Sequence, residues 1–94
     1  MRVRTRYFAA ARDAAGLADE FIEVDSGTSI ATVRALLIER HPALRIVLRQ
    51  SRLALNQRFV VDTDIVVAVV VDDEAANGVG SAVELAVIPP VAGG

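Results

Sequence analysis

The sequence predicts an α+β domain in which one main helix packs on one face of a mixed sheet. Three observations predict this fold class in a chain of 94 residues. Polar and apolar residues alternate over Arg2–Tyr7, as in a half-buried strand. Apolar residues then recur at helical spacing at Ile30, Val33 and Leu37, and a strand-like run returns at Val83–Ile88. A chain of this length is typical of a single domain with one core.

The composition argues against several classes of function. A net charge of −2 is unlike a nucleic-acid-binding protein and favours partners with basic docking surfaces. The chain has no cysteine, which excludes disulfides and thiolate chemistry and fits a cytoplasmic location. The longest apolar run, Ile65–Val71, is far shorter than the roughly 20 residues of a membrane-spanning helix. We therefore expect neither nucleic acid nor a membrane as a partner.

The first two predicted strands form an antiparallel hairpin. The first strand places Arg2, Arg4 and Arg6 on its outer face. The Ala-rich segment Ala9–Ala15 favours a short helical connection, which Gly16 ends.

The second strand is predicted at Glu20–Asp25, where Ile22 and Val24 share the inner face. Glu23 and Asp25 then become the expected cross-strand partners of the arginines. An anion-binding site built from those arginines is the alternative, and it is the less simple account.

The main helix begins after a break at Ser26-Gly27. Thr28 or Ser29 can cap its first turn. His41-Pro42 ends it, because the residue before a proline is pushed out of the α region. We expect His41 to be a surface or capping group rather than a catalytic base.

The second half of the chain continues with short elements. Ala43–Gln50 predicts a short helix, and Arg52–Asn56 predicts a short strand that turns at Asn56-Gln57. The run Ile65–Val71 is apolar and mostly β-branched, which predicts a strand buried on both faces. Asp72–Ser81 is acidic and then rich in small residues, which predicts a loop before the last strand.

No constellation of catalytic side chains is visible within the domain. The acidic residues lack the ligand alternation of a calcium loop and predict a solvated loop instead. They are Asp62, Asp64, Asp72, Asp73 and Glu74. The segment Asn77–Gly80 is a weak phosphate-loop signal, because no lysine and no helix follow it.

The informative stretch is the C-terminal segment. We expect residues 1–88 to form the domain and 89–94 to form a flexible tail ending in Gly-Gly. Pro89 and Pro90 end the last strand and hold the chain extended. Six residues reach roughly 20 Å, and two glycines can thread a narrow channel. Gly-Gly alone is equally compatible with a frayed terminus, but the whole segment suits delivery of a terminal carboxylate into another protein.

Three segments together resemble the small subunits of molybdopterin synthase, which are sulfur carriers of the MoaD/ThiS type. The segments are RYFAAARDAAG at 6–16, LALNQ at 53–57 and PPVAGG at 89–94. The resemblance implies the β-grasp, ubiquitin-like fold. Two features depart from the family pattern. Its Gly-Asp-Glu turn reads Ala82-Val83-Glu84 here, and Asp72–Ser81 is an apparent insertion.

The resemblance also implies a chemistry at the terminus. An activating enzyme consumes ATP to adenylate the carboxylate of Gly94, which follows Gly93, and the acyl group becomes a thiocarboxylate. The large subunit of the synthase then transfers the sulfur to precursor Z, the cyclic pyranopterin monophosphate. No bound cofactor or metal is implied for the small subunit, and the catalytic side chains are expected on the large subunit.

A docking surface is expected beside the tail. Phe8 falls on the arginine face of the first strand and is a candidate anchor, with Phe21 as a weaker one. The end of the last strand and the tail are the stronger candidates and are expected to lie along the large subunit as an extended segment. These residues are Ile88, Pro89, Pro90, Val91 and Ala92.

Two other functions fit the same sequence. One is a related β-grasp carrier that serves thiamine, cysteine or tRNA thiolation, or a protein modifier. The other is a ubiquitin-like interaction module whose terminus is never activated.

Overall fold

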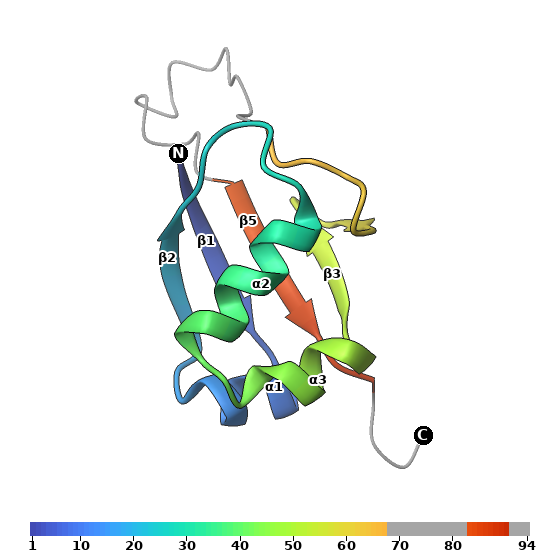
Figure 1. Ribbon diagram of the computed structural model, residues 1–94. Helices are drawn as coiled ribbons and strands as arrows, with labels where there is room; N and C mark the ends of the chain where they lie inside the picture. The colour runs from blue at the N-terminus through green and yellow to red at the C-terminus, as the bar shows by residue number, and fades with distance from the viewer. Residues whose placement is uncertain (68–82, 91–94) are drawn as a thin grey trace.

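The structure, a computed structural model, describes residues 1–67 and 83–90 and consists of a five-stranded sheet with three helices (Figure 1). The strands are β1 (Arg2–Tyr7), β2 (Asp19–Glu23), β3 (Arg52–Leu55), β4 (Arg58–Val60) and β5 (Val83–Ile88). The helices are α1 (Ala9–Ala15), α2 (Ile30–Arg40) and α3 (Leu44–Gln50).

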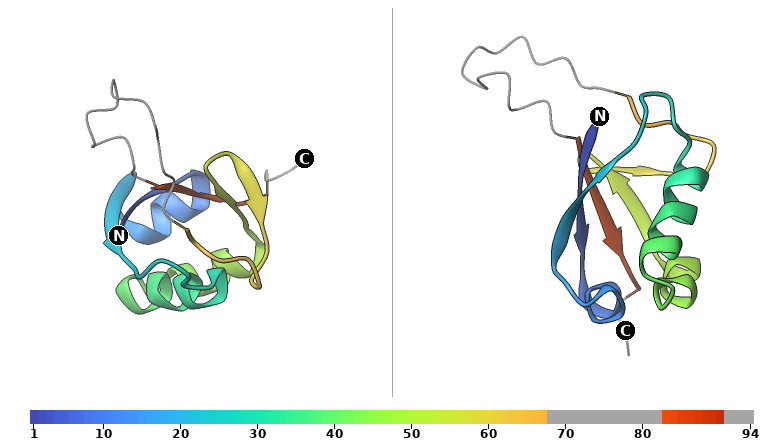
Figure 2. Two further views of the ribbon diagram at one scale, coloured as in Figure 1. Left: turned by 90° about the horizontal axis from the view of Figure 1, so that it is seen from above. Right: turned by 60° about the vertical axis from the view of Figure 1, so that its left-hand side comes forward.

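The sheet is mixed, as predicted, and has the order β2-β1-β5-β3-β4. The last strand, β5, lies at the centre, parallel to β1 and antiparallel to β3. β1 and β2 form the predicted antiparallel pair, in which Val3 lies opposite Ile22. The helices α2 and α3 lie on one side of the sheet, and α1 lies near its lower end (Figure 2). The opposite side carries no helix among the described residues, and we call it the open face.

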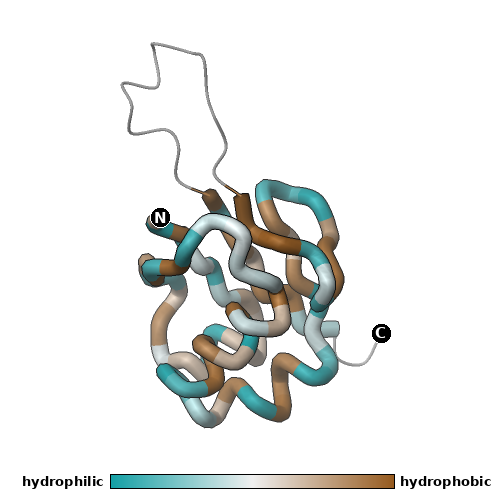
Figure 3. Tube along the Cα trace, turned by 45° about the horizontal axis from the view of Figure 1, so that its top comes forward, coloured by the Kyte–Doolittle hydropathy of each residue, from teal (hydrophilic) through white to brown (hydrophobic). Residues whose placement is uncertain are grey.

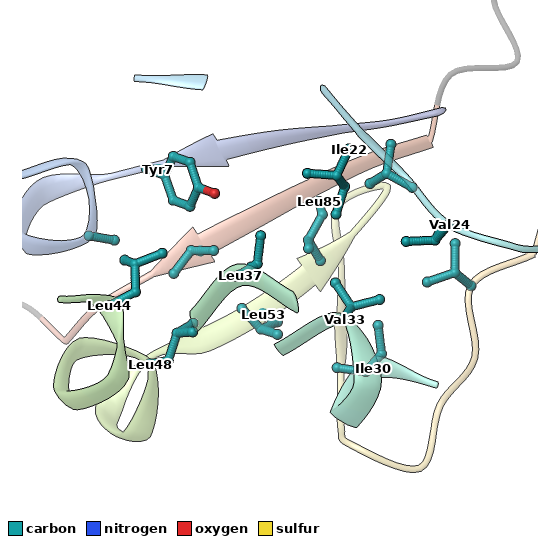
Figure 4. Close-up of a cluster of buried hydrophobic side chains, with 14 of the residues drawn as sticks. Tyr7, Ile22, Val24, Ile30, Val33, Leu37, Leu44, Leu48, Leu53 and Leu85 are labelled. Carbon is teal, nitrogen blue, oxygen red and sulfur yellow. The ribbon is translucent and has the colours of Figure 1, made fainter. Parts of the chain in front are cut away.

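The core lies between the sheet and the helices α2 and α3 (Figure 4). Val3 and Tyr7 contribute from β1, as the alternation predicts, and the predicted helical stripe of Ile30, Val33 and Leu37 is completely buried. Hydrophilic and hydrophobic segments alternate along the helices in Figure 3, as expected for helices with one buried side. Burial of this apolar surface is the main term that stabilises the domain.

The ends of the helices follow the predicted signals. Gly16 ends α1 in a left-handed conformation with a φ of 80°, which a residue without a side chain adopts at little cost. The Oγ of Ser29 accepts a hydrogen bond from the amide of Thr32 at 3.1 Å and caps α2. Thr28, the other candidate cap, instead donates its hydroxyl to the carbonyl of Asp25. His41 follows α2 as its C-cap, as predicted.

The apolar run Ile65–Val71 does not follow the prediction where the structure describes it. Val66 is fully buried, but Ile65 and Val67 are 50% and 49% exposed, and Ile65 forms only an isolated bridge with Ser29. The prediction of a strand buried on both faces is therefore wrong for residues 65–67. The central position in the sheet is taken by β5, and of residues 65–67 only Val66 contributes its side chain to the core. Residues 68–71 and the predicted loop Asp72–Ser81 lie outside the described residues.

One strand was not predicted. Asn56 and Gln57 form the expected turn, both with positive φ, and the chain then returns as β4 beside β3. Ala54 of β3 thereby pairs with Phe59 of β4. The three residues of β4 are too few to show an alternation in the sequence.

Candidate functional site: the tail root and the open face

The tail leaves the domain from the end of its central strand. β5 ends at Ile88, after which Pro89 is buried and Pro90 is exposed. We call Ile88–Pro90 the tail root. The predicted reactive residues Gly93 and Gly94, like Val91 and Ala92, lie outside the described residues.

The tail root is held firmly because its strand has a neighbour on both sides. Ile88 lies opposite Arg52 of β3, and Val87 lies opposite Tyr7 of β1. The amide of Phe8 also donates a hydrogen bond to the carbonyl of Val87 at 3.3 Å. A central strand has its backbone groups paired on both edges, so the tail starts from a rigid base. The root lies at the end of the sheet opposite to Met1 (Figure 1).

The open face has an apolar hollow beside the tail root. Ala54 and Ala86 lie opposite each other in β3 and β5, and their small side chains leave a depression of about 290 Å³. Its other lining residues are Arg6, Phe8, Gln57, Phe59, Glu84 and Ile88. The predicted candidates Phe8 and Ile88 therefore come together at one surface. Phe59 belongs to the same surface, and we did not predict it because β4 itself was not predicted.

Arginines stack on the phenylalanines that border this face. The guanidinium carbon of Arg6 lies 5.2 Å from the ring centre of Phe8, which is 39% exposed. Arg52 lies 5.1 Å from the ring of Phe59 in the same way. A cation above an aromatic ring stabilises the arrangement by about 0.5–1 kcal/mol at an exposed site. The stacks also hold the exposed rings in place.

A similar stack lies at the far edge of the sheet. There the guanidinium carbon of Arg2 lies 4.3 Å from the ring centre of Phe21, the weaker candidate anchor. The ring belongs to β2, two strands away from β5, and it is not among the residues that line the hollow.

The acidic partners of the first-strand arginines differ from the prediction. Arg4 pairs with Asp19 at 2.7 Å, and Arg6 pairs with Glu84 at 3.8 Å. Glu23 instead lies 3.7 Å from the ammonium group of Met1. Glu23 does lie directly opposite Arg2 in the β1–β2 pair, as predicted, but no ion pair forms between them. Asp25 pairs with none of these arginines, so that part of the prediction is wrong. The parallel strand β5 brings Glu84 next to β1, a neighbour that local sequence spacing does not reveal.

The sequence also did not predict a cluster of polar side chains at the end of β1. The hydroxyl of Tyr7 donates to Oε2 of Glu20 at 2.6 Å, and Nε2 of His41 lies 2.5 Å from the same oxygen. Nη2 of Arg40 donates to Oε1 of Glu20 at 2.7 Å. All four residues belong to the ends of β1, β2 and α2. We call Tyr7, Glu20, Arg40 and His41 the Glu20 cluster.

The Glu20 cluster shifts the pKa of two of its members. Burial raises the pKa of Tyr7 far above its ordinary value of 10.0, and the hydrogen bond to Glu20 raises it further. Burial alone would also raise the pKa of Glu20. The hydrogen bonds from Tyr7, Arg40 and His41 outweigh that effect and hold this pKa below its ordinary value of 4.5. Every acceptor of the carboxylate is occupied, so the cluster fastens the fold and is not an open site.

Two further findings concern the described part of the chain. No group of three or more His, Asp or Glu side chains in residues 1–67 and 83–90 is arranged to hold a metal ion. None of the described helices combines the length and the apolar character that crossing a bilayer requires.

Comparisons with known proteins agree on one family. The ThiS family matches residues 5–68. The molybdopterin synthase sulfur carrier subunit of Chlamydomonas reinhardtii is 31% identical over 94 residues, which is 100% of both chains.

Solved structures give the fold. The chain is similar to SAMP1 from Haloferax volcanii, with a TM-score of 0.76, 20% identity and 100% of both chains covered. It is also similar to a chain in the protein–protein complex of subunits 1 and 2 of the molybdopterin-converting factor from Helicobacter pylori. There the TM-score is 0.59 at 20% identity, again with 100% of both chains covered. These similarities confirm the β-grasp, ubiquitin-like fold. The match over residues 5–68 and the full-length relative show that the chain belongs to the ThiS family, and they confirm the predicted resemblance to molybdopterin synthase small subunits.

Proposed function

We propose that this chain is the sulfur-carrying small subunit of a molybdopterin synthase. The observation that carries the proposal is the 31% identity, over the whole of both chains, to the molybdopterin synthase sulfur carrier subunit of Chlamydomonas reinhardtii. The ending Pro89–Gly94 supports it, because a segment with two prolines and two terminal glycines follows directly on the central strand in the sequence.

The chemistry takes place at the carboxylate of Gly94. A carboxylate is a poor acyl donor, because its leaving group would be oxide. Attack of the carboxylate on the α-phosphate of ATP releases pyrophosphate and forms an acyl adenylate, whose leaving group is AMP. Hydrosulfide, delivered by the sulfur donor, displaces AMP and leaves the terminus as a thiocarboxylate. That sulfur then passes to precursor Z within the large subunit, and water restores the carboxylate.

The domain positions the reacting terminus rather than contributing catalytic side chains. The rigid tail root sets where the terminus can reach, which is roughly 20 Å from Pro89. Delivery of a reacting group in a fixed geometry accelerates a reaction without any acid or base on the carrier. The activating enzyme and the large subunit provide the ATP site and the acid–base groups.

The hollow on the open face is the proposed docking site for the large subunit. Phe8, Phe59 and Ile88 surround two alanines, so an apolar side chain of the partner can enter between them. The hollow lies beside the tail root, and a partner that receives the tail therefore covers both. The complex of subunits 1 and 2 from Helicobacter pylori supports a partner of this kind.

The test is the intact mass of the full chain after incubation with the activating enzyme, ATP and a sulfur donor. We expect a gain equal to the difference between one sulfur and one oxygen atom, and sulfur transfer to precursor Z once the large subunit is added. A variant without Gly93 and Gly94 should keep the fold and lose both results. If the truncated variant still supports molybdopterin synthesis, the proposal is wrong.

The same assay separates the two other functions. A carrier for a different thiolation pathway gains the sulfur mass but transfers nothing to precursor Z. An interaction module never gains the mass.

A further inference from the structure

We propose that Arg52 is a recognition residue of the open face, and that it pairs with a carboxylate on the large subunit. The inference rests on the proposed function, because the large subunit is the partner that covers the tail root. It adds the chemical nature of that partner's surface at one position.

Arg52 occupies a particular place beside the tail. It lies directly opposite Ile88, the first residue of the tail root, in the antiparallel pairing of β3 with β5. Its side chain is exposed, and its guanidinium stacks on Phe59 at the border of the hollow. A partner that fills the hollow and receives the tail must therefore come close to this cation.

The arginines of the open face differ in whether they have an acidic partner within the chain. Arg4 and Arg6 are neutralised by Asp19 and Glu84 within the chain. No Asp or Glu side chain among the described residues lies within 4.0 Å of the nitrogens of Arg52, which has Ile88 and Phe59 as its neighbours. Arg2 also has no acidic partner among the described residues, but it lies over Phe21 at the far edge of the sheet. Within the described part of the chain, Arg52 is therefore the cation of the open face without an internal counter-ion that lies beside the tail root.

The stacking on Phe59 prepares Arg52 for a carboxylate. Among the described residues, no hydrogen bond to an acceptor takes up the N–H groups of Arg52 beside this ring, so they stay available to donate. A guanidinium held in this way matches the two oxygens of a carboxylate in a bidentate pair. Covering the same cation with an apolar surface would be unfavourable, because a buried charge needs a partner.

Charge complementarity therefore selects an acidic side chain at this position of the partner. The net charge of the whole chain, −2, predicts the opposite, a basic docking surface. The charges close to Arg52 outweigh the net charge of the chain, because salt screens interactions between surface charges beyond about 10 Å.

Binding of the full chain to the purified large subunit of the same organism tests the inference by titration calorimetry. We expect Arg52→Glu to weaken binding at least about tenfold, because like charges then meet at the interface. Arg52→Met, which keeps an apolar side chain over Phe59, should weaken it about threefold to tenfold. The control is Arg45→Glu, the same charge change at an exposed position beside Ala35 and Ile38 on the helical side. It should change the affinity less than about twofold.

A second measurement locates the partner group. One Asp or Glu of the large subunit, changed to Lys, should restore the affinity of Arg52→Glu and weaken binding of the unchanged chain. Equal effects of Arg52→Glu and Arg45→Glu would overturn the inference. The inference would also be overturned if no Asp or Glu of the large subunit, when changed to Lys, restored the affinity of Arg52→Glu. If the unchanged chain gains the sulfur mass but does not bind the large subunit, the choice of partner is wrong. If it never gains the mass, the proposed function fails as well.

Discussion

Nε2 of His41 lies 2.5 Å from Oε2 of Glu20 and thereby joins the C-terminal end of α2 to the β2 strand. The side chain of Glu20 is only 10% exposed, and its oxygens also accept hydrogen bonds from Tyr7 and Arg40. A nearly buried carboxylate is stable only when it is paired in this way. The Glu20 cluster therefore fastens the main helix to the hairpin that precedes it.

The first prediction concerns acid stability. The pKa of Glu20 is lower in the folded protein than its ordinary value of 4.5, so ionised Glu20 stabilises the fold above about pH 4.5. That contribution is lost as the pH falls through the lowered pKa. We expect Glu20→Gln to lower the free energy of unfolding at pH 7 by about 2–3 kcal/mol. The difference from the unchanged protein should shrink as the pH falls, which urea titrations at a series of pH values will measure.

Glu23→Gln is the matched control, because the Glu23 side chain lies on the same strand and is 72% exposed. It should change the stability by less than about 0.5 kcal/mol at any of these pH values. A Glu20→Gln protein whose stability runs parallel to that of the unchanged protein down to low pH would contradict the assignment.

The second prediction concerns Thr5 in the middle of β1. Its side chain is fully buried, and its Oγ1 is the buried side-chain atom without a hydrogen-bond partner among the described residues. Thr5→Val replaces the hydroxyl with a methyl group of similar size and removes that desolvation cost. We expect an increase of about 1 kcal/mol in the free energy of unfolding, measured by thermal and urea denaturation.

The reverse change two residues earlier is its control. Val3 is also fully buried on the same face of β1, and Val3→Thr buries a hydroxyl where a methyl group now packs. This variant should lose about 1–3 kcal/mol. Loss of stability in Thr5→Val would mean that its hydroxyl has a partner in solution.

The elements predicted correctly are those with a local signal. Val3 and Tyr7 alternate with arginines, and the pairing of β1 in the sheet buries them as that pattern requires. Ser29 and His41 mark the two ends of α2 because capping depends on neighbours within one turn. The position of the tail root was predicted correctly for the same reason, because Pro89 cannot continue a central strand.

The features that were missed depend on contacts between distant segments. Ile65–Val67 has the composition of a central strand, but β5 occupies that position, and only pairing across the whole chain decides between them. Glu84 reaches Arg6 through the parallel pairing of β1 with β5. Glu20 and His41 are 21 residues apart and meet because α2 runs back along the hairpin.

The third prediction concerns the cap of α2. Ser29 accepts the amide hydrogen of Thr32, which would otherwise lack a partner in the first turn. Ser29→Ala should lower the free energy of unfolding by about 1 kcal/mol, whereas Ser29→Asp should retain most of it, since aspartate caps equally well. Circular dichroism during urea denaturation measures both. Equal losses in the two variants would show that the cost arises from packing rather than from the cap.

The last prediction concerns the hollow on the open face. Ala86 forms half of its floor, and Ala86→Leu places a larger side chain between Phe8 and Phe59. The fold should persist because the change is on the outer side of β5, but the partner's apolar side chain can no longer enter. We expect binding to the large subunit to weaken at least about tenfold, which corresponds to about 1.4 kcal/mol. Ala35→Leu, the same enlargement at an exposed position of α2, should leave the affinity unchanged. If Ala86→Leu binds as tightly as Ala35→Leu, the large subunit docks elsewhere, and the Phe8 and Phe59 rings serve only to cover the sheet.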